Sequence, residues 1–181
     1  GRSFALLDPL ELGDRFLVLT TDAHVVAPVF FPGGDIGRLA VSGVVNDLSM
    51  MGACDVLALT SIVIVEEGFP LESLERIHAS MQAACLEAGT RIVTGDTKVM
   101  RKGEIDGVVL STSGVGFTDR VIRDAGLRPG DAILITGDIG DHGLAVLAAR
   151  AGLGLEGDLR SDVAPLNGLV RVALAEGRDA I

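Results

Sequence analysis

The feature that most constrains the fold is a nearly unbroken apolar run from Val56 to Val65, interrupted only by a Thr-Ser pair. A run this rich in β-branched residues predicts a β-strand. It is too continuous for a strand with one face in water, because such strands alternate apolar and polar residues. We therefore expect this strand to be covered on both faces or paired with a second copy of the chain, which predicts a homodimer.

Strand-like and helix-like segments alternate on either side of this run. Helices are expected where apolar residues recur every three to four positions, and strands where β-branched runs end in turns. The expected strands span residues 15–21, 56–66, 91–94, 107–117 and 132–136, and the expected helices span 35–51, 71–88 and 141–151. This alternation predicts an α/β (α+β) fold, in which helices pack on a sheet.

A turn at Arg128–Asp131 interrupts the pattern, and we place a domain boundary between Thr118 and Arg128. This predicts a first domain over residues 1–120 and a second unit over residues 121–181. The second unit is shorter than a usual domain of about 100 residues, and the chain begins with Gly1 rather than a methionine. We therefore expect the chain to be truncated at both ends.

Composition argues against two classes of partner. A net charge of −10 leaves no basic patch for nucleic acid or for an anionic membrane, and no apolar run is long enough to span a bilayer. Cys54 and Cys85 fall on apolar helix surfaces, where a small buried side chain is the expected role. Unpaired cysteines are typical of a reducing compartment, so we expect a cytoplasmic protein.

Three carboxylates, Asp22, Asp47 and Asp96, lie in short acidic signatures at the ends of apolar runs. An ionised carboxylate removed from water is costly unless a cation or several hydrogen bonds compensate it. Mg²⁺ is such a cation, and it prefers carboxylates together with substrate phosphates. The pattern predicts a magnesium cluster that receives a phosphate ligand.

Asp47 shows this reasoning most clearly. It shares one stripe of the expected 35–51 helix with Ile36, Ala40, Gly43 and Met50, which places a carboxylate on the apolar face. The alternative is a helix rotated slightly, so that Asp47 lies in solvent.

Between the first two acids, Gly33 and Gly34 form a turn that leads directly into this helix. Free backbone N–H groups at a helix start can hold a phosphate, so the turn is a candidate phosphate cradle. Asp35 is well suited to be the N-cap instead, and a glycine turn before a capped helix is common. Both interpretations stay open.

Together these motifs carry a resemblance that runs along essentially the whole chain. The chain resembles the HypE family of hydrogenase maturation proteins, within the AIR synthase-like (PurM-like) ATP-binding superfamily. The motifs are Thr21–His24, Phe30–Gly37, Val45–Ala53, Glu66–Gly68, Gly95–Val99 and Gly140–Gly143.

The resemblance implies a first α/β domain that dimerises through its strands and a second domain that is an α-β sandwich. It also implies an activity, the ATP-dependent dehydration of an enzyme-bound S-carboxamide to a thiocyanate, which supplies the cyanide ligand of [NiFe] hydrogenase. ATP and Mg²⁺ are the implied cofactors. The carbamoyltransferase HypF and the HypC–HypD complex are the implied partners.

The resemblance also implies roles for single residues. Asp22, Asp47 and Asp96 match the family's metal and phosphate positions, and Gly33, Gly34 and Asp35 match its glycine-rich turn. Lys98 is placed to meet a phosphoryl group or the reacting amide, and otherwise is a surface lysine. His142 is a nucleotide contact or simply a helix-start residue; His24 has no assigned role, and His78 is expected to be structural.

The family's first acidic element, its Asp-x-Thr-Arg-Gly-Gly loop and its terminal Pro-Arg-Ile-Cys tail do not occur in this sequence. Without the reactive cysteine, we expect no turnover from these residues alone. Two alternatives stay open. One is a different enzyme of the superfamily, of the selenophosphate synthetase, thiamine-monophosphate kinase or aminoimidazole ribonucleotide synthetase type. The other is a non-catalytic nucleotide-binding scaffold.

Overall fold

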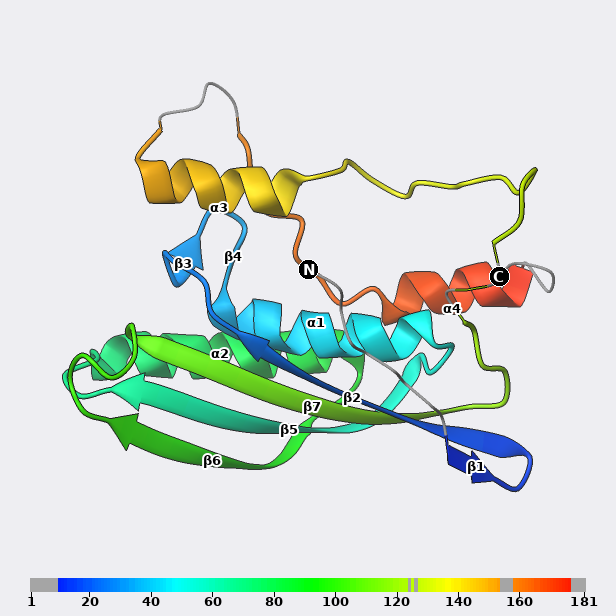
Figure 1. Cartoon of the computed structure of the whole chain (residues 1–181), viewed down its shortest axis with the longest axis horizontal. Helices are drawn as coiled ribbons and strands as arrows, with labels where there is room; N and C mark the ends of the chain where they lie inside the picture. The colour runs from blue at the N-terminus through cyan, green and yellow to red at the C-terminus, as the bar shows by residue number, and fades with distance from the viewer. Residues whose placement is uncertain (1–9, 124, 126, 154–157, 177–181) are drawn as a thin grey trace.

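A five-stranded sheet carries two long helices on one face (Figure 1). The computed structural model describes residues 10–123, 125, 127–153 and 158–176 of the 181-residue chain. The strand order is β1-β2-β7-β5-β6, with β5 and β6 parallel and the other pairs antiparallel. The strands are β1 (Leu10–Leu12), β2 (Arg15–His24), β5 (Asp55–Glu66), β6 (Ile92–Met100) and β7 (Val108–Thr118). The mixed α/β fold predicted from the sequence is confirmed.

Helices α1 (Ile36–Met50) and α2 (Leu71–Ala88) lie side by side over the sheet. β7 alternates strictly between buried and half-buried residues, and its buried residues face these helices. Gly114 of β7 is required by this packing, because a Cβ there would lie 2.5 Å from Cγ1 of Val44 and 2.9 Å from Cδ1 of Leu48. The core therefore lies between β7 and α1.

A short hairpin precedes α1. It consists of β3 (Phe30–Phe31) and β4 (Gly34–Asp35), and Gly33 turns between them with φ +90°. The Asp35 carboxylate accepts hydrogen bonds from the backbone N–H groups of Gly37 and Arg38, at 2.7 and 3.0 Å. Asp35 is thus the N-cap of α1, as its residue type favours.

Beyond β7 the chain crosses back over α1. Helices α3 (Asp141–Ala151) and α4 (Asn167–Glu176) both lie on the side of α1 away from the sheet (Figure 1). Asn46 anchors the connecting segment, because its side chain donates to the carbonyl of Ala164 (3.0 Å) and accepts from the N–H of Leu166 (2.7 Å). Of the helices in the described part of the chain, none is both long and apolar enough to cross a bilayer.

Three sequence-based expectations need correction. The strand expected at 91–94 runs on to Met100, because it pairs in parallel with the long strand β5. The strand expected at 132–136 has no ladder partner among the described residues, and Ile133 and Leu134 are 81% and 89% exposed. An apolar run becomes a strand only where a neighbour satisfies its backbone. Helix α4 was not expected.

Candidate functional site

Two of the three predicted acids meet between β2 and α1. Thr20, Asp22 and His24 occupy every second position of β2, so their side chains share the face that α1 covers. Thr20 Oγ1 donates to Asp47 Oδ2 at 3.1 Å, and His24 Nε2 lies 3.2 Å from Asp22 Oδ2. Strand and helix therefore place two carboxylates, a hydroxyl and an imidazole around one point.

Burial shifts the pKa values of Asp47 and His24. Desolvation raises the pKa of Asp47, and the nearby charge of Asp22 raises it further, while the hydrogen bond from Thr20 and the His24 ring oppose the shift. Burial also lowers the pKa of His24, although Asp22 and Asp47 pull the other way. An ionised Asp47 is thus short of positive charge, which a bound cation would supply.

This donor set fits Mg²⁺. The ion is commonly held by one or two carboxylates, with waters and substrate phosphates filling its other positions. Asp22 is half-exposed, and its carboxylate is open to such a ligand. Asp47 is therefore the more buried carboxylate of the candidate site, and Asp22 is the more exposed one.

Asp96 does not join this pair within one chain. It lies on β6, the edge strand, and two strands separate β6 from β2. It is in register with Ile62, which points to the face of the sheet away from the helices, whereas Asp22 points toward α1. The described residues contain no group of three or more His, Cys, Asp or Glu side chains arranged around one metal position. Within one chain the sheet therefore keeps Asp96 apart from Asp22 and Asp47, and the magnesium cluster of all three acids stays a prediction.

Lys98 shares the outer sheet face with Asp96, because the two residues are two positions apart on β6. Both are exposed, and Asp96 Oδ1 accepts the N–H of the next residue, Thr97, at 2.9 Å. An ammonium and a carboxylate thus stand together on an open face, separate from Asp22 and Asp47.

The glycine-rich turn packs closely against a later segment of the chain. A Cβ at Gly33 would lie 2.4 Å from the carbonyl oxygen of Ser161, and one at Gly34 would lie 2.6 Å from Val163 Cγ1. Asp35, 8% exposed, already occupies two N–H groups at the start of α1. The Asp35 cap supports the N-cap interpretation, and a phosphate-binding role for Gly33, Gly34 and Asp35 stays a prediction.

His142 is held at the first turn of α3, beside this hairpin. Its Nδ1 lies 2.9 Å from Ser161 Oγ, and its ring meets Phe31 edge-on at a centroid distance of 5.4 Å. Ser161 N–H in turn donates to the Pro32 carbonyl at 2.8 Å. His142 therefore joins the segment after α3 to the β3–β4 hairpin, and the structure does not place it beside Asp22 and Asp47.

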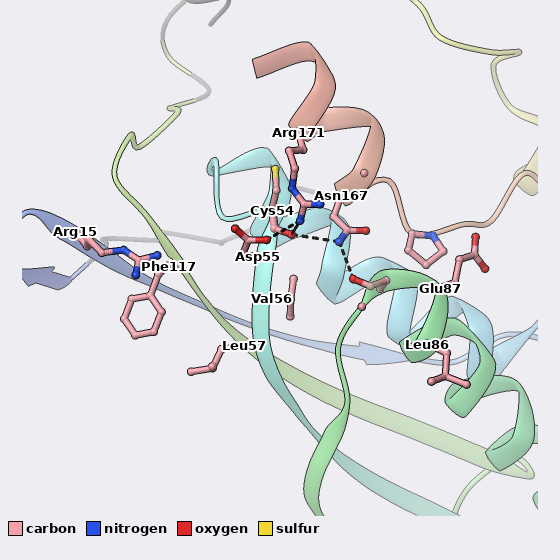
Figure 2. Close-up of a pocket in the computed structure, with 14 residues that line it drawn as sticks. Arg15, Cys54, Asp55, Val56, Leu57, Leu86, Glu87, Phe117, Asn167 and Arg171 are labelled. Atoms are coloured by element: carbon pink, nitrogen blue, oxygen red, sulfur yellow. Dashed lines mark hydrogen bonds and ion pairs between the residues drawn. The ribbon is translucent and has the colours of Figure 1, made fainter. Parts of the chain in front are cut away.

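A pocket of about 820 Å³ lies between the start of β5, the end of α2 and α4 (Figure 2). Arg171 donates to Asp55 Oδ1 and to the Cys54 carbonyl, and Asn167 donates to the carbonyls of Cys54 and Ala88. Arg15, at the opposite end of β2 from His24, also lines it. The pocket is thus remote from the acids, and its polar side chains serve to dock α4.

Thr20 and His24 are site residues to which the sequence pattern assigns no role. The signal that could have found them is their spacing, since residues 20, 22 and 24 share a face if the strand continues past Thr21. The expected strand ended at Thr21. Asp22 and His24 lie within β2 because β7 pairs with it as far as His24.

Comparison with known proteins gives consistent results. Residues 4–118 match the family model for the AIR synthase related protein, N-terminal domain. A carbamoyl dehydratase HypE from Azotobacter vinelandii is 52% identical, over 91% of this chain and 49% of that protein. The chain spans about half the length of the curated relatives it matches.

Two solved structures share the fold. A crystal structure of the hydrogenase maturation protein HypE in complex with ATP superposes with a TM-score of 0.85 and 46% identity, over 97% of this chain and 51% of that one. A crystal structure of a HypE–HypF complex gives a TM-score of 0.82 and 48% identity, over 91% of this chain and 56% of that one.

Proposed function

The chain belongs to the AIR synthase related family, its resemblance to HypE is confirmed, and we propose that it is the nucleotide-binding part of an ATP-dependent carbamoyl dehydratase. The observation that carries the proposal is the Asp22–Asp47 pair, in which burial raises the pKa of one carboxylate beside another. Such a pair is suited to a divalent cation that accompanies a nucleotide. A relative 46% identical in sequence was crystallised with ATP.

The proposed reaction dehydrates an S-carboxamide, R–S–C(=O)–NH₂, to a thiocyanate, R–S–C≡N. The amide oxygen attacks the γ-phosphorus of ATP and ADP leaves, so the oxygen becomes part of a good leaving group. Both N–H protons are then removed, and phosphate departs as the C≡N bond forms. ATP and the amide give ADP, phosphate and the thiocyanate, and the oxygen lost from carbon ends in phosphate. We propose that the reacting thiol is a terminal cysteine, which these 181 residues do not contain.

Asp22 and Asp47 would hold Mg²⁺ in this scheme, and the ion would neutralise charge on the phosphates. Thr20 fixes the Asp47 oxygen Oδ2 by hydrogen bonding. We propose that Lys98 meets the transferred phosphoryl group or the amide, and that His142 keeps the hairpin in place near the nucleotide. Of these roles, the one for His142 follows most directly from its contacts with Ser161 and Phe31.

We also propose that the active form is a homodimer. The outer face of the sheet exposes Leu19, Leu57 and Ile62, at 49%, 58% and 45%, and exposed apolar faces of this kind are typical of interfaces. Asp96 and Lys98 lie on the same face. A second copy packed there would bring an acid and a lysine to a position that one chain cannot fill by itself.

The wider assignment follows the relatives. We propose HypF as a partner, because a relative 48% identical was crystallised in a HypE–HypF complex, and we propose the HypC–HypD complex as the acceptor of the cyano group. Two buried free cysteines agree with a cytoplasmic location. We keep the division into residues 1–120 and 121–181 as part of this proposal, with the second unit as the beginning of an α-β sandwich.

Calorimetry of ATP binding tests the central claim. The parent chain is expected to bind ATP in Mg²⁺ and to bind it more weakly in EDTA. Asp47→Asn is expected to lose the Mg²⁺-dependent part, because a neutral amide does not attract the cation. Asp14→Asn, which removes an exposed carboxylate from the turn before β2, is the matched control. Equal Mg²⁺-dependent affinity in Asp47→Asn and the parent would refute the assignment.

Light scattering tests the dimer. The parent is expected to give a two-chain mass at micromolar concentration, and Ile62→Asp a one-chain mass, because it places a charge in the centre of the apolar face. A one-chain mass for the parent would contradict the proposal.

A further inference from the structure

His24 is a buried group for which neither the fold nor the proposed reaction gives a reason. It ends β2, is 8% exposed, and its Nδ1 is buried with no hydrogen-bond partner among the described residues. An unpaired buried nitrogen destabilises the folded state. A leucine of similar size would pack at this position without that penalty, so packing alone does not explain a histidine.

Its other nitrogen has a defined partner. Nε2 lies 3.2 Å from Asp22 Oδ2, and because a carboxylate only accepts hydrogen bonds, this contact favours the tautomer with the proton on Nε2. The second oxygen of Asp22, Oδ1, accepts the N–H of Ala23 at 2.7 Å. The two contacts together fix both the position and the rotation of the Asp22 carboxylate.

Helix α1 has room for the ring because residue 43 is a glycine. A Cβ at Gly43 would lie 2.9 Å from His24 Nε2, 3.4 Å from Cε1 and 3.7 Å from Asp22 Oδ2. Glycine weakens a helix interior relative to alanine, and Gly43 is in the middle of α1. The missing side chain lets the helix backbone confine the imidazole against Asp22. Gly43 is also one turn from Asp47, so this contact sets the spacing between the two acids.

His24 itself is not placed as a cation ligand. Its Nε2 faces the Asp22 carboxylate, and its Nδ1 is buried away from solvent. The ring can therefore act on a cation only through the carboxylate that it holds.

We propose that His24, confined by Gly43, is a positioning residue that fixes the Asp22 carboxylate in the orientation needed to share a divalent cation with Asp47. This inference rests on the proposed function, because it assumes that the Asp22–Asp47 pair binds a cation. It goes beyond that function by assigning cation affinity to two residues outside the pair.

The test is titration of the chain with Mn²⁺ alone, with the free ion followed by EPR. Asp47→Asn is expected to abolish Mn²⁺ binding. His24→Leu is expected to weaken the Mn²⁺ affinity of the same site by about tenfold or more, as is typical when a residue that orients a metal ligand is lost. His24→Gln is expected to restore affinity to within about threefold of the parent, because its amide nitrogen can take the place of Nε2. His78→Leu, the same change at an exposed histidine of α2, is the control and should leave affinity unchanged.

A second variant keeps the inference testable if His24→Leu does not fold. Gly43→Ala keeps the imidazole but pushes it away from Asp22, and is expected to weaken Mn²⁺ binding by a similar factor. Nitrogen NMR of the ring in the parent should show the proton on Nε2. Parent-like affinity in both His24→Leu and Gly43→Ala, with the site still lost in Asp47→Asn, would overturn this inference and leave the proposed function intact. Unchanged affinity in Asp47→Asn would instead overturn the proposed function.

Discussion

Gly37 and Gly168 allow the contact between α1 and α2 to be measured with a single kind of substitution. Each is the second residue of its helix, Gly37 in α1 and Gly168 in α4. A Cβ at Gly37 would lie 2.5 Å from the carbonyl oxygen of Ile77, 3.0 Å from Met81 Cγ and 3.0 Å from Asp35 Oδ1, the oxygen that caps α1, whereas one at Gly168 meets nothing within 4 Å. Replacement by alanine thus changes helix propensity alike in both helices and adds a steric contact only in α1.

The magnitude follows from the distances. Carbon and carbonyl oxygen normally approach no closer than about 3.3 Å, so α2 must move away from α1 by about 0.8 Å. A gap of that size loses a quarter to a half of the dispersion energy of each contact, and overpacking typically costs about 1–3 kcal/mol. Ile77 and Met81 are 1% and 2% exposed, so they cannot relax into solvent. We expect Gly168→Ala to be neutral or stabilising, and Gly37→Ala to be less stable than it by about 1–3 kcal/mol.

The assay is urea unfolding followed by far-UV circular dichroism, since the chain has no Trp or Tyr to report by fluorescence. The free energy of unfolding comes from linear extrapolation, with the slope checked for each variant. Because the propensity gain is common to both variants, their difference measures the steric effect of the added methyl group on α2 and on the Asp35 cap. If the two free energies agreed within about 0.5 kcal/mol, a typical limit for a surface change, the packing argument would be refuted.

Three further predictions use other residues. The raised pKa of Asp47 means that ionisation of this carboxyl opposes folding. Its contribution to stability is therefore fully present below the unfolded pKa of about 3.9. That contribution is lost as pH rises through the higher pKa of the folded state. In EDTA, Asp47→Asn should melt above the parent at pH 7, and the difference should close toward pH 3; a parent that melted higher at pH 7 would contradict the sign. Asn46→Asp should lower the free energy of unfolding by about 1–3 kcal/mol, because the donor to Ala164 is replaced by a second acceptor; unchanged urea unfolding would show that this anchor contributes nothing. Burial raises the pKa of both Cys54 and Cys85, so a thiol reagent should label them slowly in native protein and rapidly in urea, and rapid native labelling at pH 7 would show that one of them is accessible.

Local structure followed from local sequence. The glycine turn, the Asp35 cap and the length of α2 depend on contacts within a few residues, and each was predictable from residue type and spacing. The apolar run of β5 predicted a strand covered on both faces or paired with a second copy; one face packs against α1 and α2, and the cover on the other face stays a prediction. These features depend on the backbone and on residues nearby in the chain.

The arrangement of the candidate site depended on tertiary structure. Asp22, Asp47 and Asp96 have similar signatures, and the sequence alone makes them equivalent. β7, the last strand in the chain order, inserts between β2 and β5, and β6 takes the edge. That order leaves Asp96 on the opposite face, while it directs Asp22 toward Asp47 beneath α1.

The same holds for the residues that surround the pair. The sequence does not show that Ser161, far along the chain, packs against Gly33, and His24 gained a role only through its contacts with Gly43 and Asp22. Periodicity reports which face of an element is apolar, but it does not report which neighbour that face meets. The sequence determined the elements and the chemistry available to them, and the long-range order of the strands decided which side chains meet.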